Sequence, residues 1–299
     1  MKFHVVVNRW ANFYFFVQNL SEWHFSNRTN YNYLWRKELG PFSSEEELAL
    51  SRFREIHKNY SFGKMYLGRQ FFLEDDPWIT LEEKLEAEEL ENIKKTFSLF
   101  EKKFEKIYEK DLSSFEYWQI ELQEKLNRED IINSIVTILG SLYNTGQISK
   151  TITIYLLFSA GNLTGGTGGV VNDQSLLIEV SQTPLSRINY VIGTIWHECI
   201  HASFENQYFM PLLKKKYLDD LDMISLIKEV VASALFPNGI LGQKIFNNKE
   251  KLLHIKIPRQ YNALILSLVN EYIKRKEKFD DRFIELLQTY VFKLKGIVK

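Results

Sequence analysis

The chain contains very little cysteine, since Cys199 is the only one among its 299 residues. A single thiol cannot form a disulfide within the chain, which excludes the disulfide scaffolds of small secreted proteins, and it cannot build a four-cysteine zinc site. The sequence therefore favours a reducing compartment, and we expect the protein to be cytoplasmic. We expect Cys199 itself to be a packing residue and not a nucleophile, because it has no CxxC partner.

The chain also lacks net charge, because 38 basic residues balance 38 acidic ones. No overall field of one sign favours nucleic acid or an anionic membrane surface, so we expect neither as a partner. Specificity must therefore come from a local site.

Long hydrophobic runs are absent too. Residues 131–149 and 151–172 carry no charge, but their Asn, Ser, Thr and Gly content makes both poor membrane spans, so no transmembrane segment is predicted. The first twenty residues make a poor signal peptide, because Arg9 interrupts their apolar run and no small-residue cleavage site follows. Whether a leader has already been removed stays open.

The residues that are present predict a globular protein with a real core, at 45% hydrophobic and 25% charged residues. We expect a helical N-terminal region over residues 1–130 and a core with C-terminal helices over residues 131–299. Ser43 and Ser44, followed by the pair Glu46 and Glu47, fit a capping box at the start of a helix. The Glu- and Lys-rich run 81–111 predicts a solvated helix with local ion pairs, and a partner-binding helix is its alternative.

The predicted fold class is α+β, mainly helical with a small mixed β-sheet. Residues 131–143 indicate a buried helix, and the β-branched runs 151–158 and 175–181 indicate strands. The glycine-rich stretch 161–169 lacks GxGxxG spacing and precedes a strand, so we expect a turn into an edge strand and no phosphate loop. Further helices are expected over 184–204, 219–236, 259–275 and 279–295.

The sequence HECIH, residues 197–201, is the most informative motif. His197 and His201 lie four residues apart, so on a helix their imidazoles project from one face and can converge on one zinc ion. Glu198 need not bind the metal and can take a proton from a zinc-bound water. These residues predict a Zn²⁺ site with Glu198 as the catalytic general base.

The order of strand, glycine-rich turn, strand and HExxH helix resembles the zincin metallopeptidases over about residues 131–240. The resemblance implies a zincin-like core with an HExxH active-site helix, and a peptide or protein as substrate. It also implies that residues 169–181 form the edge strand that holds an extended substrate by backbone pairing. A plain structural strand is the alternative.

A catalytic zinc generally takes three protein ligands. Metzincins have a third histidine six residues after the second, and Gln207 stands there in this chain, which excludes that branch. Glu229 is the better candidate, because metal binding would offset the cost of placing a carboxylate in an almost wholly apolar helix. A glutamate on a second helix after the HExxH motif resembles the gluzincin arrangement, which implies His197, His201 and Glu229 as ligands.

Several other residues compete for roles at this site. Ser233, one turn after Glu229, could support the ligands. Rival acidic ligands are Glu205, which we expect to point past the metal, and Asp219, Asp220 and Asp222, which suit a helix N-terminus. Candidates to stabilise an oxyanion are His254, Tyr261, Tyr208 and Tyr217.

The function that these residues predict is a zinc-dependent metallopeptidase of the gluzincin type. Two alternatives stay open. The chain could be a non-catalytic helical interaction protein with an accidental or inactive HExxH, in which Glu229 is a salt-bridge partner or faces solvent. It could also be a zinc hydrolase that acts on a non-peptide substrate, because the motif activates water and does not select the bond.

Overall fold

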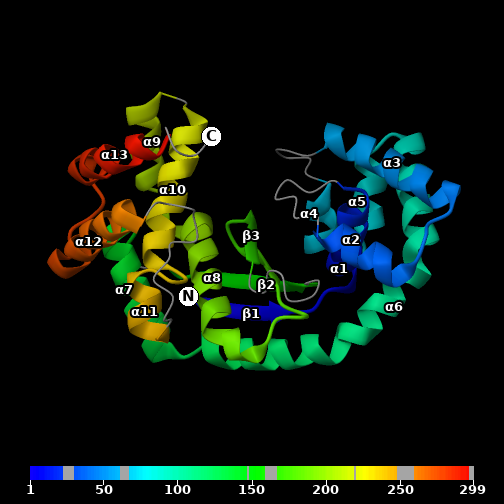
Figure 1. Cartoon of the computed structure of the whole chain (residues 1–299), viewed down its shortest axis with the longest axis horizontal. Coiled ribbons are helices and arrows are strands. Elements are labelled where there is room, and N and C mark those ends of the chain that lie inside the picture. Colours follow the sequence, from blue (N-terminus) through cyan, green and yellow to red (C-terminus); the bar gives the residue numbers. More distant parts are fainter. Residues whose placement is uncertain are drawn as a thin grey trace.

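A computed structural model of the chain describes residues 1–22, 30–60, 67–146, 148–158, 167–218, 220–247 and 259–295. Over these residues the fold is α+β and mainly helical, with one small mixed sheet (Figure 1). Before the HExxH motif the helices are α1 (Arg9–Leu20), α2 (Asn30–Leu39), α3 (Ser44–Asn59), α4 (Gly68–Leu73), α5 (Pro77–Lys84), α6 (Ala87–Leu126) and α7 (Glu129–Tyr143). The others are α8 (Ile188–Cys199), the π-helix η4 (Ile200–Phe204), α9 (Phe209–Tyr217), α10 (Leu221–Leu235), α11 (Ile240–Phe246), α12 (Arg259–Arg275) and α13 (Asp281–Lys295).

The sheet has four strands in the order β1-β2-β4-β3. Strands β1 (Lys2–Val6), β2 (Thr151–Leu157) and β4 (Ser175–Glu179) run parallel, while β3 (Thr167–Asn172) runs antiparallel to β4. Side chains on the five residues of β1 alternate between exposed and buried, as expected for a strand with one face on the core. The sheet therefore takes its first strand from the region that we predicted to be helical.

The predicted strands and helices after residue 130 are otherwise present, with shifts at their ends. The run 175–181 becomes β4, and 151–158 becomes β2. The segment 169–181 was predicted to be one edge strand. It instead contains most of β3, a turn and β4, so the predicted bounds of the edge strand were wrong. Pairing places β4 between β2 and β3, which leaves β3 as the edge. Residues 159–166 of the glycine-rich stretch lie outside the described residues.

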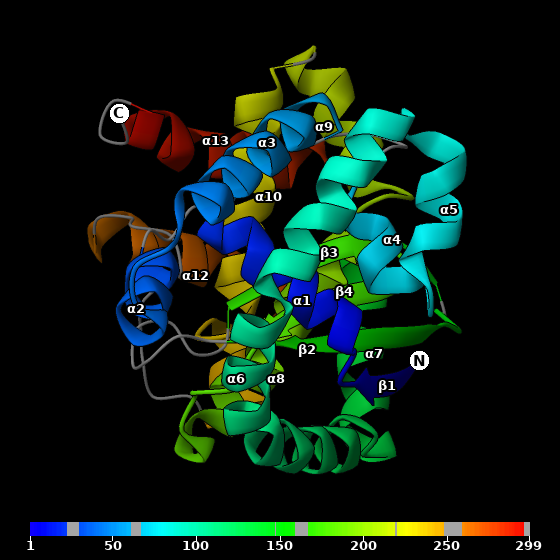
Figure 2. The same ribbon diagram turned by 90° about the vertical axis from the view of Figure 1, so that its right-hand side faces the viewer.

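Helix α6 connects the two sides of the molecule. Its 40 residues run under the sheet at one end and beside α3 and α5 at the other (Figures 1 and 2). The run 81–111 supplies much of this helix, and it has an apolar face as well as a charged one: Ile93, Phe97, Phe100 and Phe104 are buried. Its lysines pair with other helices, as in Lys95–Glu45 and Lys110–Glu38.

Helix α1 is buried along most of its length and packs against this apolar face of α6. Phe13 stacks on Phe104 with 4.2 Å between ring centroids, and Phe71 of α4 stacks on Phe97 at 4.9 Å. Stacked and edge-to-face rings of this kind add to the energy of simple area burial. The four consecutive aromatic residues of α1, Phe13 to Phe16, are therefore core residues.

Within the part of the chain that the structure describes, one segment, Leu221–Phe246, is long and apolar enough to span a membrane by length and composition. Its 18-residue apolar window is 72% buried inside the molecule, and the segment contains two helices, α10 and α11, with a break between them. A mostly buried helix with this composition is typical of a protein core.

Candidate metal centre

The candidate metal centre lies where the end of α8 meets α10. His197 is in the last turn of α8, and His201 follows in the π-helix η4, where the Glu205 amide donates to the Ile200 carbonyl five residues back at 3.2 Å. Short π-helical turns of this type occur frequently at functional sites. Glu229 extends from the middle of α10.

These three side chains converge. The Nε2 atoms of His197 and His201 are 3.1 Å apart, and they lie 3.3 and 3.2 Å from the two carboxylate oxygens of Glu229. One ligand atom from each residue lies within 4.8 Å of the others, so the group could hold a metal ion. The structure thus brings together the three residues that the sequence analysis selected as ligands.

The hydrogen bonds of the two Nδ1 atoms, which face away from the centre, determine the tautomer of each histidine. His197 Nδ1 lies 3.2 Å from the Phe236 carbonyl oxygen, and His201 Nδ1 lies 3.0 Å from the Glu205 carboxylate. Both oxygens only accept hydrogen bonds, so each neutral imidazole carries its proton on Nδ1. Two Nε2 lone pairs and one carboxylate then face each other, an arrangement that repels unless a cation neutralises it.

The spacing fits a small divalent ion. Donor atoms about 2.0–2.2 Å from a tetrahedral zinc lie about 3.3–3.6 Å from one another. The 3.1 Å between the two Nε2 atoms is within a few tenths of an ångström of that range, and each Nε2 lies 3.2 or 3.3 Å from a different oxygen of the Glu229 carboxylate. Nitrogen and carboxylate donors in a set of three suit zinc, while leaving a fourth position for another ligand.

The centre is open on one side. The side chains of His197 and His201 are 6% and 10% exposed, whereas that of Glu229 is 46% exposed. The carboxylate of Glu229 is thus less enclosed than the two imidazoles, although the helix around it is almost wholly apolar. The partial exposure of Glu229 leaves water and small molecules a route to the centre.

Electrostatic interactions within the group shift its titrations strongly. Burial lowers the pKa of His201, but Glu205 and Glu229 outweigh burial and raise that pKa to about 10. Burial raises the pKa of Glu229, but His197 and His201, when they donate protons from Nε2 in the absence of a metal ion, outweigh burial and hold that pKa far below its usual range. The group thus strongly attracts positive charge, which either protons or a metal ion can supply.

Glu198, the predicted general base, lies beside the triad and contacts the edge strand. Burial raises its pKa, against the opposing effect of the two histidines. A Cβ atom added at Gly168 of β3 would lie 2.7 Å from the Glu198 Cγ and 3.1 Å from its Oε1. Only a glycine at position 168 lets the strand approach Glu198 this closely.

Glu205 does not join the triad as a ligand. As expected it points past the centre, because its carboxylate lies behind His201 on the Nδ1 side. Sequence reasoning had not assigned it this contact, although an acidic residue four positions after a histidine is a usable signal for one. Ser233 was the expected supporting residue, yet its buried hydroxyl has no hydrogen-bond partner among the described residues.

The other predicted candidates lie elsewhere or cannot be placed. Asp220 caps α10 by accepting a hydrogen bond from the Met223 amide at 3.0 Å, and Asp222 lies in the same first turn. Lys278 lies over the ring of Tyr208, 4.9 Å from its centroid. Burial raises the pKa of Tyr217 to about 12. Of the remaining candidates, Tyr261 lies in the first turn of α12 with a half-buried side chain, while Asp219 and His254 lie outside the described residues.

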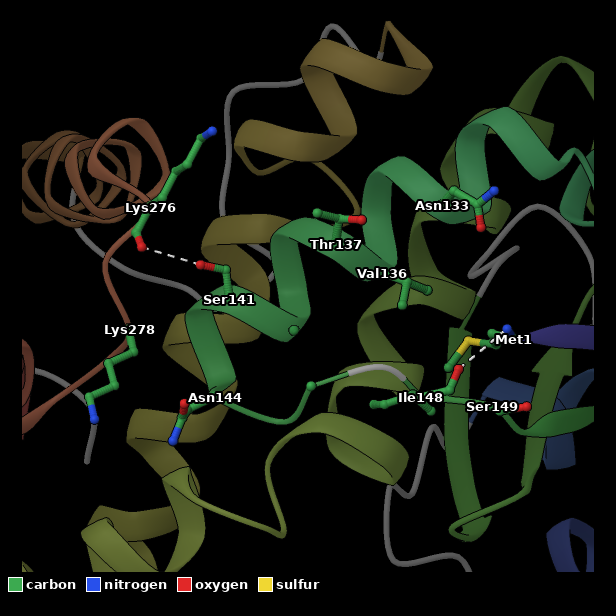
Figure 3. A pocket seen from close by; sticks show the side chains of 12 residues that line it. Met1, Asn133, Val136, Thr137, Ser141, Asn144, Ile148, Ser149, Lys276 and Lys278 are labelled. Carbon is green, nitrogen blue, oxygen red and sulfur yellow. Dashed lines mark hydrogen bonds between the residues drawn. The ribbon is translucent and has the colours of Figure 1, made fainter.

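A pocket of about 1020 Å³ lies apart from this centre, along α7 and the turn between α12 and α13 (Figure 3). Its lining includes Asn133, Ser141 and Asn144, with Lys276 and Lys278 at one side. The Ser141 hydroxyl donates to the Lys276 carbonyl at 3.2 Å. No member of the triad lines this pocket, so its volume does not bear on the metal centre.

Comparisons of the chain with models of protein families, with curated protein sequences and with solved structures gave no match. The candidate site therefore rests on the geometry of its own residues.

Proposed function

We propose that the chain is a zinc-dependent metallopeptidase of the gluzincin type within the zincins. The observation that carries the proposal is the convergence of His197, His201 and Glu229, with Glu198 beside them and next to a sheet edge. His197, His201 and Glu229 would hold the zinc. The HExxH helix and the mixed sheet with an antiparallel edge strand support the zincin assignment.

When bound, zinc would lower the pKa of a water molecule and polarise the carbonyl group of a substrate. Glu198 accepts the proton of the attacking water and then passes it to the leaving amine. Its position next to the two histidines keeps it within reach of the centre without its being needed as a ligand. The raised pKa of Glu198 suits a group that takes up a proton and gives it back.

A peptide is the favoured substrate because of β3. Among the described strands, β3 pairs with β4 along one side and is last in the sheet order, so its other edge can offer backbone groups to an extended chain. Gly168 brings β3 directly against Glu198, which lies where a side chain at this position would project from the face of the strand. A peptide that pairs with the other edge of β3 would therefore extend the sheet beside the strand that contacts the general base.

Metal analysis combined with one substitution tests the proposal. We expect about one zinc ion per chain in both the wild type and Glu198→Gln, because Glu198 is not a ligand. Hydrolysis of a mixed peptide library should fall by at least about 100-fold in Glu198→Gln, the usual contribution of a general base.

Two outcomes would contradict the proposal. A wild-type chain that takes up no zinc at neutral pH would favour the interaction protein whose HExxH is inactive. A zinc-loaded chain that cleaves no peptide but hydrolyses ester or amide compounds in a Glu198-dependent manner would favour the non-peptide hydrolase.

A further inference from the structure

Glu205 is a fully buried carboxylate with two partners at the metal centre. One oxygen, Oε2, lies 3.0 Å from His201 Nδ1 and 3.0 Å from Lys228 Nζ, and the side chain is 0% exposed. Burying a carboxylate is costly unless charged or hydrogen-bonding partners compensate. Both compensating groups belong to segments that supply the candidate ligands.

The two contacts connect the parts of the site that come from different elements. His201 is itself a candidate ligand in η4, and Lys228 directly precedes the candidate ligand Glu229 in α10. Glu205 follows at the end of η4, where the π-type hydrogen bond to Ile200 sets its backbone position. One carboxylate thereby orients one ligand and holds the helix that carries another.

We propose that Glu205 is a positioning residue for the metal centre. It accepts the Nδ1–H bond of His201, which turns Nε2 toward the ion, and Lys228 anchors Glu205 against α10. This inference rests on the proposed metal function and adds a residue outside the HExxH motif to the working site. A carboxylate behind a metal-binding imidazole fixes the ring and raises its basicity, and its loss weakens metal binding 10- to 100-fold.

The zinc dissociation constant of the full-length chain, measured by competition with a chromophoric chelator, tests this role. We expect it to rise about 10-fold in Glu205→Gln, whose amide is a weaker acceptor. We expect the zinc dissociation constant to rise about 100-fold in Glu205→Asp, because the shorter side chain keeps the charge but does not reach His201 Nδ1. In both variants the visible spectrum of the cobalt-loaded protein should change, because the orientation of His201 changes.

Glu46→Gln is the matched control, since Glu46 is also a buried carboxylate paired with a lysine, Lys103, and lies in α3 away from the centre. It should leave the zinc dissociation constant unchanged. If Glu205 had only a structural role, its variants would lower the unfolding temperature of the metal-free protein, as we expect for Glu46→Gln. Their zinc affinity and cobalt spectrum would then be unchanged. That result would overturn the inference and leave the proposed function standing.

A measurement on the wild type covers the case in which the Glu205 variants do not fold. Nitrogen-15 spectra of the zinc-loaded chain should show the His201 proton on Nδ1. A proton on Nε2, or binding of zinc through Nδ1, would overturn the inference even if peptidase activity is present. A wild type that binds no zinc would overturn both the inference and the proposed function.

Discussion

Gly168 is the residue at which the sheet and the catalytic group meet. Its missing side chain leaves the space that Glu198 occupies, whereas a Cβ at the neighbouring Gly169 would meet nothing within 4 Å. The two glycines share one strand and differ in what they face. Substitutions at these two glycines can therefore distinguish the effect of crowding Glu198 from the effect of adding a side chain to β3.

Gly168→Ala should reduce peptide hydrolysis at least about 10-fold while zinc stays bound. The new methyl group would displace Glu198, and displacement of a catalytic group by about 1 Å can cost that much or more. Gly169→Ala should retain most of the activity. Steady-state kinetics and metal content of the two variants provide the check, and equal activities would show that the approach of β3 to Glu198 has no catalytic importance.

At the residue scale, the sequence was sufficient to select His197, His201 and Glu229. The helical spacing of the two histidines and the rarity of charge around Glu229 are visible in the chain itself. The contact of Glu205 with His201 was not predicted, although their four-residue spacing allows it, because the sequence analysis considered Glu205 only as a rival metal ligand. The exposure of Glu229 depends on how α8 and α10 pack, which is a tertiary property.

Helix α3 shows how a local signal and a long-range contact combine in one element. The predicted capping box is confirmed: the Ser43 hydroxyl accepts from the Glu46 amide, and the Glu46 carboxylate accepts from the Ser43 amide. Lys103 of α6 also binds Glu46. Burial raises the pKa of Glu46, but the bonds from Lys103 and Ser43 outweigh burial and lower it below the usual 4.5.

Glu46→Gln should lower the free energy of unfolding near neutral pH by about 1 kcal/mol, as for loss of a cap or a paired charge. The lowered pKa means that the stabilisation is complete above the unfolded-state pKa and is lost as pH falls through the folded-state pKa. The difference between variant and wild type should therefore shrink on acidification. Urea denaturation at neutral and acidic pH measures it.

Glu45→Gln serves as the comparison for this prediction. Glu45 pairs with Lys95, but its side chain is 57% exposed, so solvent screens the pair. Its removal should change the free energy of unfolding by only a few tenths of a kcal/mol at either pH. An equal effect of the two substitutions would contradict a special role for the buried carboxylate.

At the element scale, long periodic helices were predictable and the strand order was not. Residues 131–143 and 259–275 match α7 and α12 because their apolar spacing is regular. Strand β1 was missed because its five residues run directly into the apolar helix α1 with only a short break. Residues 175–181 were predicted as a strand, but β3 was missed as a separate strand, because the resemblance placed 169–181 in one edge strand and the turn at Asn172–Gln174 contains no glycine or proline.

The sheet takes strands from both predicted regions, and α6 of the N-terminal region also binds the other region, where Ser114 donates to the Ser181 carbonyl and Trp118 to the Thr183 carbonyl. β1 pairs with β2 from Lys2↔Thr151 to Val6↔Tyr155, and Gln123 of α6 also binds the β1 backbone at Phe3 and Val5. Phe3 and Val5 are buried in the common core. Residues 131–299 therefore depend on the N-terminal region for one strand of their sheet.

A fragment comprising residues 131–299 should fail to fold, whereas the full chain should unfold in one transition. Without β1 and α6 the β2 edge would lose its backbone partners, and the apolar residues beneath the sheet would be exposed. Coincident thermal transitions by circular dichroism and tryptophan fluorescence check the full chain. A monomeric fragment with well-dispersed amide signals would contradict this prediction and restore residues 131–299 as an independent domain.

The buried position of Cys199 has a practical consequence for studying the metal centre. The thiol lies on the packed side of the same helix that carries His197, and it is 0% exposed. Adventitious metals commonly attach to accessible thiols, and this chain presents none in its native form. A metal stoichiometry measured on the folded protein can therefore be attributed to the histidine and carboxylate site without first replacing the cysteine. On denaturation the same thiol becomes accessible, so its reaction with a thiol reagent reports unfolding.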